Sequence, residues 1–120
     1  MASGTVTKYL SGSDSGWEDI PQSSSMSGTG TLRYRKFGDI VQVMASKVQV
    51  KNAITGTYVV LGTVPEGNRP VDFVAANIII GSNYYNGYVA PDGGVSINKL
   101  NNSNIPSGTN IYFSCFYFLG

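Results

Sequence analysis

The sequence contains no histidine and only one cysteine in 120 residues. Without histidine, the Ser-His-Asp and Cys-His nucleophile systems and most zinc sites are excluded. A single cysteine cannot form an internal disulfide. Cys115 lies in an aromatic stretch, where we expect a small buried side chain rather than a reactive thiol. The sequence therefore predicts a protein that is not an enzyme and that needs neither a cofactor nor a metal.

Charge is scarce and nearly balanced. Eight Lys and Arg residues against seven Asp and Glu residues give a net charge of +1, and charged residues make up 12% of the chain. This balance gives no reason to expect nucleic acid or an anionic membrane as a partner. The longest apolar run, around Ile78–Ile80, is far shorter than the ~20 residues of a membrane helix, so we expect no membrane insertion. With so few charged residues, uncharged polar side chains must make up most of the solvent-exposed surface, and an oligomer would bury part of that surface.

The composition favours an all-β protein. Fifteen glycines and eight tyrosines accompany many β-branched residues, and no helical period extends over more than one turn. Turn signals separate short alternating segments, which predicts a single-domain antiparallel β-sandwich of jelly-roll type with eight or nine short strands. We expect one domain over residues 1–120, with 1–16 as a flexible N-terminal connector that includes an edge strand at 5–10.

The stretch 31–70 specifies its structure most clearly. A strand runs to a turn at 37–39, and a second strand follows with alternating apolar residues. Its parity changes before Val48, which predicts a β-bulge near Ser46-Lys47. We also expect a mobile surface loop at 22–30.

Three further segments carry turn or strand signals. Residues 71–80 predict a strand with a bulge or bend at Ala76-Asn77. Residues 81–87 predict a loop, because Asn86-Gly87 is a strong turn signal. Residues 88–97 predict a hairpin around a Gly-containing turn.

The last strand, 110–119, is apolar on both faces. One face carries Ile111, Phe113, Cys115, Tyr117 and Leu119. A strand covered on both faces belongs in the middle of a sheet. We therefore expect the core on that side and a neighbouring subunit on the other, which gives a predicted oligomer interface of Tyr112, Phe116 and Phe118.

A tyrosine- and asparagine-rich group is the main candidate binding site. Tyrosine offers a flat apolar face with a hydroxyl, and asparagine offers paired donors and acceptors, which together suit a sugar ring. The alternative is that these residues pack at a subunit contact. The predicted saccharide-binding residues are Asn83, Tyr84, Tyr85, Asn86 and Tyr88.

Carboxylates flank the only tryptophan, Trp17. Asp14, Glu18 and Asp19 could hydrolyse a glycoside or hold calcium, but a solvated turn around an anchoring tryptophan explains them more simply. Asp92 precedes two glycines and could bind a metal, but a turn needs the same residue types.

Arg33, Arg35 and Lys36 form the only basic cluster. They could bind an anionic polymer such as an acidic polysaccharide. The alternative is the polar face of a strand, paired with Asp19 or Asp39.

Four segments in this order, YRKFGDIVQV, LGTVPEGNRP, GYVAPDGGVSI and IYFSCFYF, resemble a known family. They are similar to the C-terminal receptor-binding (head) domains of tail-fibre and baseplate proteins in tailed phages and prophages of Gram-positive bacteria. The departure is Val64, where leucine is more usual. The resemblance covers nearly the whole chain. The matching motifs specify turns and loops of the fold, and the binding residues of the family vary among its members. None of these binding residues can therefore be carried over to this sequence.

The resemblance implies a β-sandwich head, usually a homotrimer, that binds bacterial cell-surface saccharide without catalysis. It also implies a place at the tail tip or baseplate of a virion, beside other tail proteins, acting outside the cell on host wall or capsule saccharide. A second hypothesis is a structural trimerisation or decoration module without a ligand. A third is a glycan depolymerase that uses Asp14, Glu18 or Asp19.

Overall fold

The computed structural model describes residues 14–54, 58–98 and 105–119, and the edge strand expected at 5–10 lies outside them. The described part contains strands and no helix, so none that could span a membrane. All strands pair antiparallel in one sheet of order β1-β2-β3-β8-β5-β6-β7-β4. The predicted all-β antiparallel fold is confirmed. The eight strands are β1 (Glu18–Asp19), β2 (Thr31–Phe37), β3 (Ile40–Gln49), β4 (Tyr58–Thr63), β5 (Val74–Ile80), β6 (Asn83–Val89), β7 (Gly94–Asn98) and β8 (Asn110–Phe118).

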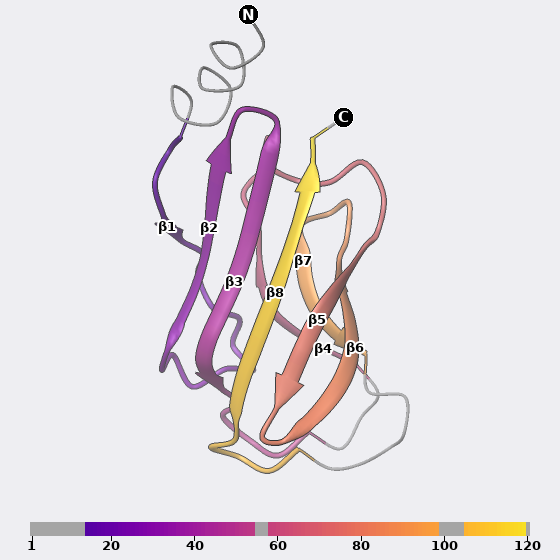
Figure 1. The fold of residues 1–120 in the computed structure, drawn as a ribbon. Coiled ribbons are helices and arrows are strands. Elements are labelled where there is room, and N and C mark those ends of the chain that lie inside the picture. The colour runs from indigo at the N-terminus through magenta and orange to yellow at the C-terminus, as the bar shows by residue number, and fades with distance from the viewer. Residues whose placement is uncertain (1–13, 55–57, 99–104, 120) are drawn as a thin grey trace, which may run out of the picture.

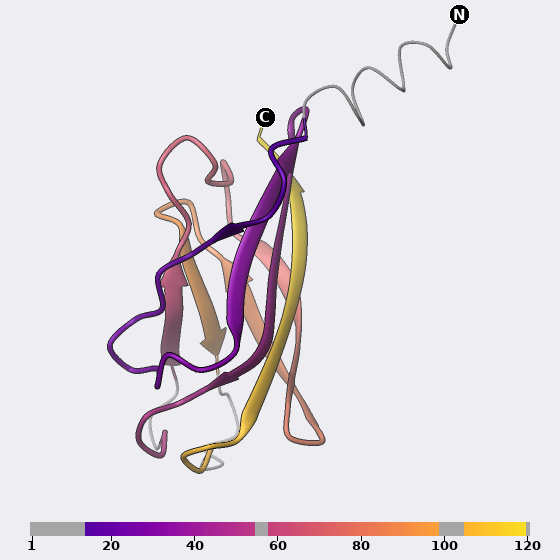
Figure 2. The ribbon, with the colours of Figure 1, turned by 90° about the vertical axis from the view of Figure 1, so that its left-hand side faces the viewer.

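The sheet curls until its two ends face each other (Figure 1). Figure 2 shows β2, β3 and β8 on one side of the molecule and β4 with β7 on the other. Side chains from both sides fill the space between them, because alternate residues of each strand point inward. The largest fully buried side chains of this core are Phe113, Leu32, Leu61, Ile78, Ile97, Ile105 and Ile111.

The β-bulge predicted in β3 is confirmed. Ala45 pairs with Phe113 and Val48 with Ile111, so Ser46 and Lys47 together stand opposite one residue of β8. Lys47 takes up the extra residue with a positive φ of 56°. The bulge returns Val48 to the core, where it is fully buried.

The loop predicted at 81–87 is wrong, because residues 83–89 form strand β6. Gly87 is buried in the middle of this strand, and a Cβ on it would collide with the Ile78 side chain and the Ser96 carbonyl oxygen. The glycine therefore allows a close approach between strands rather than a turn.

The bulge predicted at Ala76-Asn77 is also wrong. The β5–β6 register runs unbroken from Val74 opposite Val89 to Ile80 opposite Asn83. The inward row of β5 begins at Val74, and Phe73 lies before the strand with 62% of its surface exposed. No change of parity is therefore needed.

The loop expected to be mobile at 22–30 is anchored. Met26 is buried in the core with 3% exposure. The Ser23 amide donates to the Leu61 carbonyl (2.7 Å), and the Ser27 amide donates to the Gln49 carbonyl (2.8 Å). The mobile-loop prediction is therefore wrong for this segment.

Strand β8 lies in the middle of the sheet between β3 and β5, as predicted. Its inward side chains, Ile111, Phe113, Cys115 and Tyr117, are buried. Burial raises the pKa of the Cys115 thiol to about 11, so the thiol stays protonated at neutral pH. On the other face, Phe116 and Phe118 are 68% and 65% exposed. The chain's described residues thus cover only one face of this strand.

Candidate functional site

Strand β6 divides the predicted saccharide-binding residues between its two faces. Tyr84, Asn86 and Tyr88 lie on the outer face, opposite Ile79, Asn77 and Ala75 of β5. Tyr84 is 84% exposed. Tyr85 points inward and packs against the core, and Asn83 stands exposed at the start of the strand. A strand therefore presents three of the five residues together on one surface.

An open aromatic hollow of about 390 Å³ lies on this outer face. Tyr58 of β4 and Phe73 are 53% and 62% exposed. Phe73 meets Tyr88 edge to face, with ring centroids 5.1 Å apart and an interplanar angle of 83°. We call this surface the aromatic hollow. It is lined by Tyr58, Phe73, Tyr88, Ala90, Pro91 and Asp92.

Polar groups accompany these rings. The Tyr58 and Ser96 hydroxyl oxygens lie 3.3 Å apart. Burial, and then the neighbouring Tyr58, raise the pKa of Tyr88, so its hydroxyl remains a donor at neutral pH. One carboxylate oxygen of Asp92 accepts the Gly94 amide (2.9 Å), which confirms the turn and orients the carboxylate at the rim. Apolar faces with convergent hydroxyl and carboxylate groups can hold a sugar ring.

Of these three rings, only Tyr88 belongs to the saccharide-binding group predicted from the sequence, and Tyr58 and Phe73 were not among its members. Tyr58 lies on β4 and reaches the hollow because β4 pairs with β7, which pairs with β6. Phe73 lies just before β5, although the sequence predicts it within a strand over 71–80. Only the strand order brings the three rings together, so no local signal identified them.

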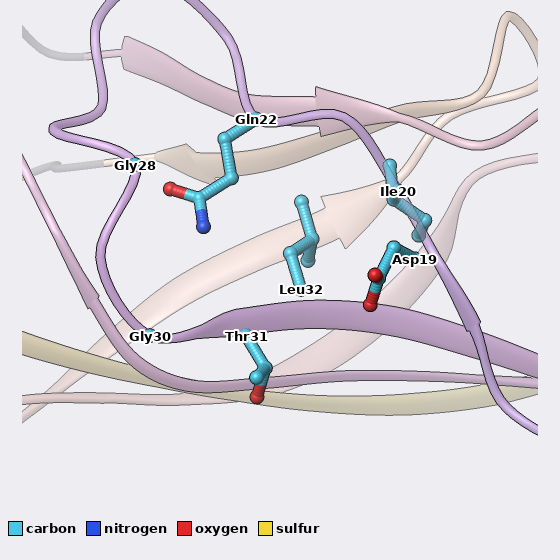
Figure 3. A pocket seen from close by; sticks show the side chains of 7 residues that line it. All are labelled: Asp19, Ile20, Gln22, Gly28, Gly30, Thr31 and Leu32. Atoms are coloured by element: carbon cyan, nitrogen blue, oxygen red, sulfur yellow. The ribbon is translucent and has the colours of Figure 1, made fainter.

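A second, polar hollow of about 410 Å³ lies beside the anchored loop, with the buried side chains of Ile20 and Leu32 in its wall. Figure 3 shows the Asp19 carboxylate and the Gln22 amide on opposite sides of Leu32. The Gln22 side-chain nitrogen donates to the Thr29 carbonyl (3.1 Å), while its buried side-chain oxygen has no partner among the described residues. This hollow can accept hydroxyl groups, but it has no aromatic ring on which a sugar could stack.

The three carboxylates near Trp17 have different surroundings. Asp14 accepts two hydrogen bonds from the Arg35 guanidinium, and these lower the pKa of Asp14 to about 2. Glu18 accepts the Tyr34 hydroxyl, which raises the pKa of Tyr34 to about 12. Asp19 lines the polar hollow. No group of three or more potential metal-binding His, Cys, Asp or Glu residues occurs in the described part of the chain.

The arginines of the basic cluster lie on the outer face of β2. The guanidinium carbons of Arg33 and Arg35 are 5.9 Å and 5.7 Å from the centre of the Trp17 ring. Arg35 pairs with Asp14 rather than with the Asp19 or Asp39 expected. The tryptophan therefore anchors the N-terminal segment to β2 by cation–π contact.

No protein-family model matches the sequence, and no curated protein matches it either. Among solved structures, the chain is similar to the crystal structure of the head domain of phage bIL170. That structure comes from a study of the receptor-binding domains of lactococcal phages. The TM-score is 0.69 at 22% identity, over 87% of this chain and 97% of that chain. The chain therefore has the fold of the head domain of a lactococcal phage.

Proposed function

We propose that this domain is the receptor-binding head of a phage tail protein and that it binds saccharide on the host cell surface without catalysis. The fold shared with the phage bIL170 head domain supports the receptor-binding role. The single observation that carries the saccharide proposal is the open aromatic hollow around Tyr58, Phe73 and Tyr88. The domain would act outside the host cell, at the tail tip or baseplate of the virion.

The proposed contacts follow from the outer face of β6. The exposed rings of Tyr58 and Phe73 offer apolar surface for the carbon face of a sugar. Asp92 can accept hydroxyl hydrogens at the rim. Tyr84 and Asn86 extend the same face beyond the hollow. Tyr85 packs against the core and supports the strand rather than the ligand.

Self-association into a homotrimer is part of the proposal. Phe116 and Phe118 are exposed on the outer face of β8, and Phe118 pairs with Ile40 of β3. Tyr112, which is 38% exposed, extends this face along the strand. Covering such aromatic side chains with a second copy would remove apolar surface from water. Three weak saccharide sites on one rigid head would then gain affinity through avidity.

Binding to a panel of immobilised wall and capsule polysaccharides from Gram-positive bacteria, including lactococci, tests the proposal. We expect Phe73→Ala and Tyr88→Ala each to weaken retention about tenfold, which corresponds to about 1.4 kcal/mol. The matched control is Val71→Ala, because Val71 is 75% exposed but does not line the hollow. Equal losses in the control and in Phe73→Ala would contradict the assignment of the site.

The uncovered face of β8 also suits a structural module that trimerises without a ligand. A wild-type trimer that binds no polysaccharide in the panel would favour that module. Release of reducing sugar from the same polysaccharides would instead indicate a depolymerase.

A further inference from the structure

A small hollow of about 70 Å³ lies on the outer face of β2 and β3, away from the residues that line the aromatic hollow. Thr31 stands opposite Ser46, and Arg33 stands opposite Met44, so these four side chains share one face. Trp17 and Met44 are each 39% exposed. We call this surface the tryptophan hollow. It is lined by Trp17, Thr31, Arg33, Met44 and Ser46.

The two arginines beside Trp17 differ in their pairing. Asp14 neutralises Arg35, whereas Arg33 forms no ion pair with any described residue. The hydroxyl-bearing residues Thr31 and Ser46 line the same hollow as Arg33. The tryptophan hollow thus combines a guanidinium without an ion pair among the described residues and two hydroxyl groups that can donate hydrogen bonds. An arginine in this state is suited to an external oxyanion, which its planar fork can bind through two hydrogen bonds.

Asp19 lies on the neighbouring strand β1, where its Cα pairs with that of Arg33. Its side chain lines the polar hollow and makes no ion pair with Arg33. The Asp19 charge still lowers the positive potential at Arg33, because it is a negative charge on the neighbouring strand. Removing this charge should therefore strengthen the attraction of an anion to the tryptophan hollow.

We propose that the tryptophan hollow binds one oxyanion group, a carboxylate or a phosphate, carried by a larger ligand. Its volume admits a single small group, whereas a site that encloses a whole ligand usually measures about 300 Å³ or more. Trp17 and Met44 supply apolar flanks for the carbon atoms next to the anion. The assignment of that ligand as a host-surface polymer rests on the proposed function. The oxyanion site itself rests only on the residues of β2, β3 and Trp17.

NMR titration of the full chain with three small probes tests the oxyanion site. Glucuronate carries a carboxylate, glucose 6-phosphate carries a phosphate, and glucose carries neither. We expect at least one charged probe to shift the Arg33 Nε–H and Trp17 indole N–H signals, and glucose to leave both in place. The two charged probes distinguish carboxylate from phosphate. Raising the salt concentration should weaken the shifts, because exposed charges are screened.

Substitutions distinguish binding at the tryptophan hollow from nonspecific attraction of anions to positive charge on the protein. Arg33→Gln should raise the Kd of the charged probe at least about fivefold. The Kd of Arg33→Lys should lie between those of the wild type and Arg33→Gln, because lysine retains the positive charge but cannot donate two parallel hydrogen bonds. Lys51→Gln removes one exposed positive charge outside the hollow and should have no effect. Asp19→Asn should tighten binding. Circular dichroism of each variant verifies folding.

Three results would overturn the inference. These are equal shifts with glucose, an equal loss in Lys51→Gln and Arg33→Gln, or no shift of the Arg33 signal with either charged probe. The outcome is independent of the proposed function. Phe73→Ala should leave glucuronate binding intact, and a wild-type domain that retains no polysaccharide can still bind the small anions.

Discussion

Both faces of β8 carry large aromatic residues, but the two faces meet different surroundings. Phe113 points inward and is 1% exposed, whereas Phe116 points outward and is 68% exposed. Tyr117 and Phe118, neighbours in sequence, are 4% and 65% exposed. Folding accounts for the burial of the first face only. The Phe116 and Phe118 side chains of the second face have no cover from the described chain, and the proposed self-association would cover them.

The difference separates two kinds of energetic role. Inward aromatic residues stabilise the monomer, because they lose contact with water when the chain folds. Outward aromatic residues contribute little to the stability of the folded subunit, and they contribute binding energy when a second molecule covers them. Paired substitutions on the two faces of β8 can separate these two roles.

The largest effect is expected at Phe113. Phe113→Ala should lower the free energy of unfolding by about 3–5 kcal/mol, because it removes buried apolar surface and leaves a cavity. Urea denaturation of the isolated domain measures this change. Phe116→Ala is the matched substitution on the other face and should change the free energy of unfolding of the dissociated subunit by less than about 0.5 kcal/mol. Similar losses for both variants would break the comparison.

A second effect concerns Gly87, which lies beneath Ile78 in the core. Gly87→Ala should lower the free energy of unfolding by about 1–3 kcal/mol, because the added Cβ meets the Ile78 side chain and a backbone oxygen. Asn86→Ala changes the neighbouring residue on the outer face and should be nearly neutral. Thermal unfolding followed by circular dichroism checks both. An unchanged midpoint for Gly87→Ala would contradict the strand assignment of β6.

Self-association should depend on the outer face of β8, whereas the stability of the folded subunit depends on the inner face. The double variant Phe116→Ser, Phe118→Ser should shift the protein from trimer to monomer, because polar side chains leave no apolar surface for a second copy to cover. Sedimentation velocity measures the oligomer. The monomer should retain the circular dichroism spectrum of the wild type. A variant that remains trimeric would show that another surface holds the subunits together.

The smallest effect is expected at the N-terminal anchor. The Arg35 guanidinium lowers the pKa of Asp14 from 3.8 to about 2. Because the folded-state pKa is lowered, this pairing stabilises the folded chain above pH 3.8 and is lost as the pH falls towards 2. Fluorescence of Trp17 should report a transition in that range, which Asp14→Asn should remove. A transition of unchanged size in the variant would assign it to another group.

Much of the fold could be predicted because its signals are local. The parity change between Ala45 and Val48 required an extra residue in β3, and the bulge lies there. The apolar residues on both faces of 110–119 predict a strand in the middle of the sheet, and β8 lies there between β3 and β5. The Gly-containing turn before Gly94 follows from residue types that suit such a turn.

The misassigned segments depend on contacts that are distant in sequence. Asn86-Gly87 has a strong turn propensity, but packing of Gly87 against Ile78 and Ser96 requires a glycine within a strand. Met26 reaches the core from a segment without periodicity. Tyr58 and Phe73 join Tyr88 only through the order of strands. Propensity and pattern contain no information on such pairings.

Hydroxyl-radical footprinting of the wild-type protein, with and without a retained polysaccharide, tests the central claim most directly. If assembly covers the outer face of β8 and a ligand covers the aromatic hollow, Phe116 and Phe118 will be protected in both samples, and Phe73 and Tyr88 will be protected only with the polysaccharide. Rapid oxidation of Phe116 and Phe118 in the free protein, at the rate of the highly exposed Tyr84, would contradict the account.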